Sequence, residues 1–112
     1  MGDTVNEFAF GDLRFDWLQV VKGQTRLPLT DLERRILEYV VVRRPSELSG
    51  ISIASHLYGR APSEYDIRSF WTTLCNLRKK LRTANTVVTI ESRKTGGMKR
   101  NYAAGLLMQA AE

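Results

Sequence analysis

The chain has 112 residues, of which 43% are hydrophobic and 26% are charged, and its formal net charge is +5. This length and composition predict one globular domain with a modest core of its own. The sequence has no apolar run of membrane-spanning length and no secretory signal, and its single cysteine, Cys75, excludes an internal disulfide, so we expect a cytoplasmic protein.

Short strands are predicted for residues 7–29. Apolar and aromatic residues alternate with polar ones from Phe8 to Trp17, and this alternation is typical of half-buried strands. The segments 11–12 and 22–24 contain glycine beside polar residues and supply the turns. We expect an antiparallel meander of three or four strands.

Two helices are predicted next. Thr30 and Glu33 have the spacing of a capping box, in which each residue satisfies a backbone N–H group of the other. The first helix therefore begins at Thr30, and Pro45 prevents it from continuing. A second, shorter helix is predicted for residues 49–58 and ends at Gly59.

The third helix, predicted for residues 66–81, has one apolar face and one polar face. Its apolar residues recur at intervals of three and four, and they are Ile67, Phe70, Leu74, Leu77 and Leu81. The other face has cations, hydroxyl groups and an amide, with no carboxylate from residue 68 to residue 89. Because helices that only need solubility usually mix both charge signs, this face indicates a polyanion with readable edges, such as duplex DNA.

A strand at 86–92, a Gly-Gly turn and a return strand at 99–103 predict a C-terminal hairpin. The basic residues gather in the third helix and this hairpin. Residues 68–100 hold nine Lys or Arg and one Glu, whereas residues 1–67 hold eight Lys or Arg and ten Asp or Glu. This concentration is typical of a nucleic-acid site, and the alternative is a basic face that is simply solvated.

The predicted fold class is α+β: a winged helix-turn-helix with an N-terminal antiparallel sheet, three helices and a C-terminal β-hairpin wing. The domain is expected to span residues 7–104, between short tails at 1–6 and 105–112. In such a fold the third helix enters the major groove of DNA, and cations of the wing reach the flanking backbone or the minor groove.

Three short motifs occur in order along the chain. Segment 29–37 contains Leu-Thr-x-x-Glu-x-x-Ile-Leu, Tyr-Gly stands at 58–59, and segment 68–81 reads Arg-Ser-Phe-x-x-x-Leu-x-x-Leu-Arg-Lys-Lys-Leu. Their order and spacing resemble the DNA-binding domain of the OmpR/PhoB family of bacterial response regulators. The resemblance covers residues 8–104 and implies a DNA-binding transcriptional regulator.

The resemblance also implies three roles for individual positions. The major-groove positions are Trp71, Thr72, Thr73, Cys75 and Asn76. The phosphate-binding positions are Arg68, Ser69 and Arg78. The loop 59–65 is the surface that some members of the family use to touch RNA polymerase.

The residues themselves add to these roles. Asn76 suits an adenine edge because its amide can bond to two atoms of that base. Arg78 is expected on the side of the helix opposite the core, where it would bind a phosphate. Trp71 is expected to flank the core, and a contact with another protein is the alternative. The candidate DNA-binding residues are Arg68, Ser69, Trp71, Thr72, Thr73, Cys75, Asn76, Arg78, Lys79, Arg93, Lys94, Lys99 and Arg100.

The sequence departs from the family pattern at three points. The base-facing positions 73, 75 and 76 are neutral, where the family often has charged residues or histidine. The wing at 93–102 is longer and more basic than the family's tight turn. No receiver domain accompanies the domain, so the chain is expected to be either a stand-alone regulator or an excised fragment, and Met1 favours the first.

Other functions remain as alternatives. The main one is an adaptor that binds RNA polymerase or another regulator, since a winged helix does not by itself fix a function. A homodimer on DNA stays open. An enzyme is not expected, because His56 is the only histidine and nothing in the sequence pairs it with Cys75. We expect no metal and no cofactor.

Overall fold

The computed structural model describes residues 7–16, 19–44, 46–94 and 100–107, and for residues 93 and 94 it describes the backbone alone. Trp17 and the turn at 95–99, which contains the candidate wing residue Lys99, lie outside the described residues.

The N-terminal meander has four strands, β1 (Phe8–Phe10), β2 (Leu13–Asp16), β3 (Gln19–Lys22) and β4 (Thr25–Arg26). They pair antiparallel in sequence order, which confirms the predicted meander. Leu13, Phe15 and Val20 are buried on the core side of this sheet. The alternation in the sequence therefore marks the face that packs on the helices.

The first two helices follow the sequence signals closely. In α1 (Asp31–Val42) the Thr30 hydroxyl accepts from the Glu33 N–H at 3.2 Å, and Glu33 Oε1 accepts from the Thr30 N–H at 2.8 Å, so the capping box is confirmed. Helix α2 (Gly50–Tyr58) ends at Gly59, whose φ of 69° lies in the left-handed region that glycine adopts without strain.

The third helix, α3 (Glu64–Thr83), is longer than predicted at both ends. Ser63 caps it, and Asp66 completes a capping box by accepting from the Ser63 N–H at 3.0 Å. Asp66 therefore lies within the first turn and is not the first residue of the helix. Tyr65 belongs to the helix as well, although the sequence placed it in the preceding loop.

The C-terminal hairpin consists of β6 (Val88–Lys94) and β7 (Arg100–Leu106). The return strand runs further than predicted, because Leu106 still pairs with Val88. A short strand that the sequence did not predict, β5 (Leu48–Ser49), pairs with β7 at Tyr102 and Asn101. The second sheet therefore has the order β5-β7-β6 and ties the segment before α2 to the hairpin.

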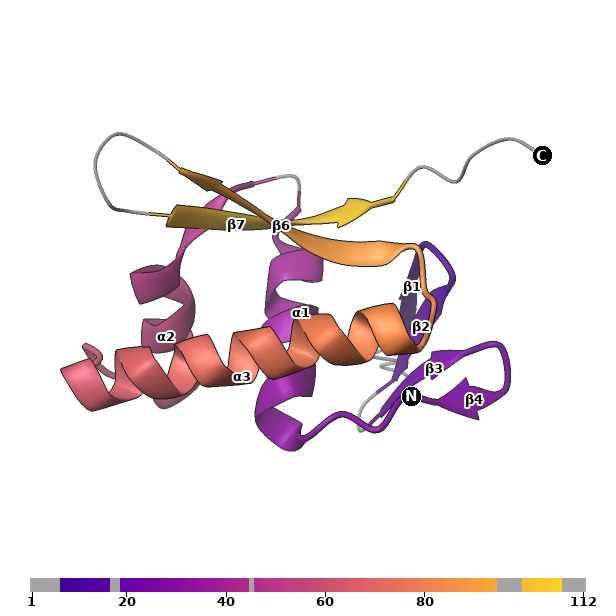
Figure 1. Ribbon diagram of the computed structural model, residues 1–112, viewed down its shortest axis with the longest axis horizontal. Coiled ribbons are helices and arrows are strands. Elements are labelled where there is room, and N and C mark those ends of the chain that lie inside the picture. Colours follow the sequence, from indigo (N-terminus) through magenta and orange to yellow (C-terminus); the bar gives the residue numbers. More distant parts are fainter. Residues whose placement is uncertain (1–6, 17–18, 45, 95–99, 108–112) are drawn as a thin grey trace, which may run out of the picture.

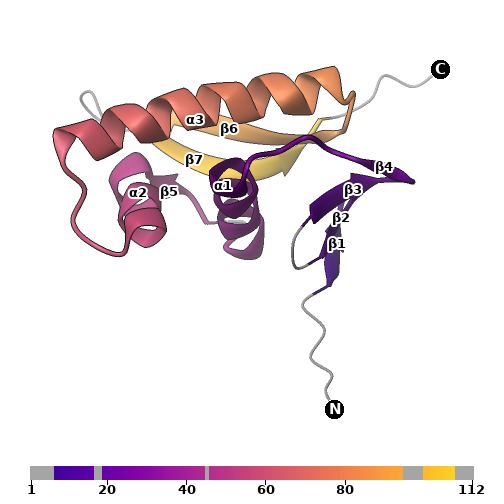
Figure 2. The ribbon, with the colours of Figure 1, turned by 90° about the horizontal axis from the view of Figure 1, so that it is seen from below.

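The arrangement is the predicted winged helix-turn-helix. Figure 1 shows α3 lying lengthwise, with the hairpin on one side of it and the meander near its C-terminal end. In Figure 2, α1 and α2 lie on one side of α3, and its opposite side is uncovered. A shared core joins the parts; α3 contributes Phe70, Leu74, Leu77 and Leu81 to it. Among the described helices, none has both the length and the apolar character needed to cross a membrane.

Candidate nucleic-acid interface

The uncovered side of α3 forms a continuous polar stripe. Arg68, Thr72, Cys75, Lys79 and Arg82 follow one another at intervals of four and three, which places them on one helix face. All five are exposed, as are Tyr65 and Asn76 beside them. We call these seven residues the outer face; they are Tyr65, Arg68, Thr72, Cys75, Asn76, Lys79 and Arg82.

The charged residues of the outer face are all cations. Within the described part of the chain, Arg68, Lys79 and Arg82 form no ion pair and no hydrogen bond through their side chains. Their charges are therefore available to an anionic ligand. The face could place three cations on phosphates while Thr72 and Asn76 reach the edges of bases.

Arg78 does not lie where the sequence analysis expected it. Its Nε and Nη2 atoms donate to the carbonyl oxygen of Ile90 in β6 at 3.1 and 2.6 Å. Its guanidinium also lies over the ring of Tyr102, 5.8 Å from the centroid. The expectation that Arg78 lies opposite the core is wrong, because the hairpin packs against that flank of α3. Arg78 instead fastens the hairpin to the helix.

Lys80 is likewise engaged within the fold. Its Nζ donates to Glu33 Oε1 at 2.8 Å and to the carbonyl oxygen of Pro28 at 2.8 Å. Only 4% of the Glu33 side chain is exposed, and Glu33 is also the capping residue of α1. Lys80 therefore neutralises a buried carboxylate and joins α3 to the start of α1.

Two candidate residues lie on the flank of α3 and not on its outer face. Ser69 and Thr73 are half-buried. The Thr73 hydroxyl donates to the carbonyl oxygen of Ser69 at 2.8 Å, within the helix itself. Since this bond occupies the Thr73 hydroxyl proton, Thr73 is less well placed for a base contact than Thr72.

Trp71 connects α3 with the hairpin through a contact with the core residue Tyr102. Its ring meets the edge of Tyr102 with centroids 6.2 Å apart, and 39% of the residue is exposed. The guanidinium of Arg100 lies 6.0 Å from the Trp71 ring centroid. The base of the wing thus brings one exposed cation, Arg100, beside the N-terminal half of α3.

The remaining wing candidates are described only in part. The backbones of Arg93 and Lys94 pair with Asn101 and Arg100 across the hairpin, and Lys99 lies outside the described residues. Their roles as DNA contacts stay predictions.

The two acidic groups near the start of α3 differ in exposure. Glu64 is exposed, whereas Asp66 is buried and pairs with Arg60 at 2.5 and 3.2 Å. The pKa of Asp66 lies below its ordinary value of 3.8, because its carboxylate accepts from the Ser63 backbone and hydroxyl groups and faces Arg60. Asp66 thus stays ionised, with its charge balanced by Arg60, and the loop 59–65 is held against the helix.

Sequence reasoning missed two residues of the outer face. Arg82 follows Lys79 by three positions and Tyr65 precedes Arg68 by three, so the helical period alone could have found both. Both lie outside the predicted helix, which spans residues 66–81, and inside the observed one.

The described residues hold no cluster of three or more His, Cys, Asp or Glu side chains suited to a metal ion. His56 stacks on Tyr39 with ring centroids 3.9 Å apart. Its pKa is lowered by burial and by the nearby charges of Arg35 and Arg43. His56 is thus an exposed ring that stacks on Tyr39 beside cations.

Comparison with known proteins adds one relationship. No family model matches the chain. Over 55 residues the chain is 42% identical to proteins named flagellar transcriptional regulator FtcR from Brucella abortus (strain 2308), Brucella suis biovar 1 (strain 1330) and Brucella melitensis biotype 1. The matched segment is 49% of this chain and 24% of each of those proteins. The similarity is therefore to part of a transcriptional regulator.

Proposed function

We propose that this chain binds double-stranded DNA in a sequence-specific way and regulates transcription. The observation that carries the proposal is the outer face of α3, which is uncovered, positively charged and furnished with an amide and a hydroxyl group. The similarity to regulators named FtcR supports the same role. The OmpR/PhoB-type motifs in the sequence support a major-groove mode of binding.

In this mechanism α3 enters the major groove with the outer face toward the bases. Arg68, Lys79 and Arg82 contact phosphates and fix the helix in register, while Thr72 and Asn76 read base edges. Arg100 and the other hairpin cations bind the flanking backbone. If about six cations contact phosphates, affinity falls on the order of a thousandfold between 50 and 200 mM salt.

A second candidate function is an adaptor that binds RNA polymerase or another regulator. The exposed aromatic groups favour it: Tyr65 is 77% exposed, and Trp71 is 39% exposed. Tyr65 belongs to the segment 59–65, Trp71 contacts the hairpin, and large exposed aromatic side chains are common anchors in protein interfaces.

Selection from a pool of random duplexes distinguishes the two functions. Enrichment of one sequence motif is the result expected for a sequence-specific regulator. An unenriched pool, together with retention of RNA polymerase on the immobilised protein, would instead support the adaptor.

The same selection tests the roles of two neighbouring outer-face residues. Asn76→Ala removes a base contact, so the motif should lose its preference at one position. Lys79→Ala removes a phosphate contact, so it should weaken binding to all duplex sequences alike and leave the selected motif unchanged. An Asn76→Ala motif identical to that of the unmodified protein would remove Asn76 from the readout.

A further inference from the structure

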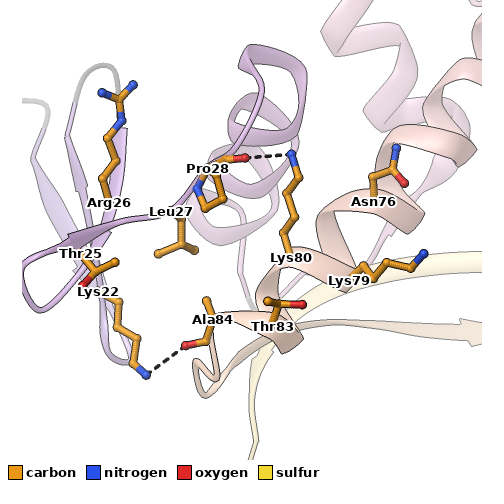
Figure 3. Close-up of a pocket in the computed structure, with 10 residues that line it drawn as sticks. All are labelled: Lys22, Thr25, Arg26, Leu27, Pro28, Asn76, Lys79, Lys80, Thr83 and Ala84. Atoms are coloured by element: carbon orange, nitrogen blue, oxygen red, sulfur yellow. Dashed lines mark hydrogen bonds between the residues drawn. The ribbon is translucent and has the colours of Figure 1, made fainter.

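A groove of about 450 Å³ lies between the meander and the C-terminal half of α3. Figure 3 shows its two walls. One wall consists of Lys22 from β3, Thr25 and Arg26 from β4, and Leu27 and Pro28 after it. The other wall comes from α3 and its end, and consists of Asn76, Lys79, Lys80, Thr83 and Ala84. This volume is within the range of sites that bind small ligands or peptide side chains.

The walls of the groove are fixed relative to each other by polar bonds. Lys22 Nζ donates to the carbonyl oxygens of Ala84 and Asn85 at 3.1 and 3.0 Å. Lys80 crosses the opposite end and donates to the carbonyl oxygen of Pro28 (Figure 3). Asp12 accepts from Val87 N–H at 3.3 Å and holds the meander against the turn after α3. The groove is therefore a formed site and needs little rearrangement to accept a ligand.

The lining combines an apolar floor with a positive rim. Leu27, Pro28 and Ala84 supply the apolar surface, and no Asp or Glu of the described ranges lines the groove. Four cations line it, namely Lys22, Arg26, Lys79 and Lys80. Of these, Lys80 alone pairs with a carboxylate of the residues that the structure describes, that of Glu33.

The cations leave the floor open. In Figure 3, the Arg26 side chain extends away from α3 and the Lys79 side chain extends away from β4. Across the described parts of the chain, neither forms an ion pair or a side-chain hydrogen bond. A ligand with an apolar group at its centre and negative charges on both sides would match this distribution.

We propose that this groove binds an acidic peptide segment of a partner protein, with one apolar side chain seated on Leu27, Pro28 and Ala84. Carboxylates on either side of that anchor face Arg26 and Lys79. A DNA backbone matches the groove less well than such a peptide does. It carries charge for the rim, but it has no apolar side chain that fills the floor.

The position of the groove implies competition with DNA. Asn76 and Lys79 line the groove and also belong to the outer face. A peptide that covers them removes a base-reading amide and a phosphate-binding cation from α3. This part of the inference rests on the proposed function: the acidic partner would release the chain from its duplex.

The test uses a fluorescein-labelled synthetic peptide in which Asp and Glu residues flank a central Leu-Phe pair. Anisotropy measures its affinity, and amide shifts of the isotope-labelled full chain map its site. We expect shifts at Thr25, Leu27, Asn76 and Thr83. A peptide with Ser in place of Leu and Phe should bind at least about tenfold more weakly, since the apolar anchor is lost.

Arg26→Glu and Arg14→Glu are matched variants, because both reverse one exposed arginine of the meander and only Arg26 lines the groove. Arg26→Glu should lower the affinity for the peptide about tenfold, and Arg14→Glu should lower it less than about twofold. Thr83→Trp narrows the groove without changing its charge, and it should also lower the affinity for the peptide. Equal effects of the two arginine variants, or amide shifts away from the groove, would overturn the proposal.

A second measurement separates the peptide from DNA. Excess unlabelled peptide should raise the apparent Kd for a duplex, and a complex that contains both ligands would refute competition. If Arg26→Glu weakens duplex binding as much as peptide binding, the groove is a DNA-backbone site and the proposal is wrong. If no duplex binds but the peptide responds to Arg26→Glu as expected, the proposed DNA-binding function fails and the peptide site stands.

Discussion

Lys79 and Lys80 are neighbours in the sequence, but they belong to two different regions of α3. Lys79 lies on the outer face and has no partner among the described residues. Lys80 lies on the side of α3 that faces the start of α1, where it bonds to Glu33 and Pro28. Arg82 and Arg78 differ in the same way, because Arg82 is exposed and Arg78 bonds to Ile90.

This comparison shows that a cation's angular position around the helix decides its role. Arg78 and Lys80, which face the hairpin and the start of α1, stabilise the fold, and bonds within the chain hold their charged groups in place. Cations of the outer face contribute little to the fold, and they remain available for a polyanion. Two of the four basic residues at 78–82 therefore bond within the fold, and the other two are exposed. Lys79 is the control for Lys80, and Arg82 is the control for Arg78.

The largest expected effect on stability comes from Lys80→Ala. The substitution leaves the Glu33 carboxylate buried without its cation, and it should lower the free energy of unfolding by about 2 kcal/mol. Lys79→Ala is the matched control and should change it by less than about 0.5 kcal/mol. Urea unfolding followed by circular dichroism measures both values, and equal values would show that Lys80 and Glu33 do not interact as described.

Arg78→Ala should have the next largest effect. It removes the two hydrogen bonds to the Ile90 carbonyl and the contact with the Tyr102 ring, and we expect a loss of about 1 kcal/mol. Arg82→Ala should leave the unfolding midpoint nearly unchanged. If Arg82→Ala proves the more destabilising of the two, the assignment of Arg78 to the hairpin contact is wrong.

The effect of Asp66 depends on pH. Its pKa is depressed in the folded chain, so its contribution is present above the ordinary carboxyl value of 3.8 and is lost as the pH falls through the folded-state pKa. Asp66→Asn should be less stable than the unmodified protein at pH 7, and the difference should shrink on acidification. Unfolding midpoints between pH 7 and pH 3 measure this.

Glu64→Gln provides the control for the pH series, since Glu64 is exposed in the same helical turn. Its stability should follow that of the unmodified protein across the range. A constant difference between Asp66→Asn and the unmodified protein at every pH would contradict the role given to the Asp66 charge.

The local elements of the fold could be predicted from the sequence because their signals are local. Thr30 and Glu33 lie within one turn, and each alternating strand carries its own pattern. The core stripe of α3 follows from the helical period, and Phe70, Leu74, Leu77 and Leu81 are all buried. The start of α3 differs from the prediction, because the apolar stripe begins only at Ile67 and the capping box of Ser63 and Asp66 lies before it.

The division of the cations could not be predicted in the same way. The helical period shows which side of α3 is buried, but not which flank the hairpin and α1 cover. Arg78 meets Ile90, and Lys80 meets Glu33, only after distant parts of the chain have packed. The groove between Leu27 and Ala84 has the same origin, since its walls come from segments that are far apart in the sequence.

The salt dependence of duplex binding tests the central claim, that the outer face of α3 contacts DNA phosphates. The measurement compares the unmodified protein with the double variant Arg68→Ala and Lys79→Ala on one duplex. Each lost phosphate contact reduces the slope of log affinity against log salt by about 0.9, so the variant's slope should be shallower by about 1.8. Equal slopes for the two proteins would contradict the claim.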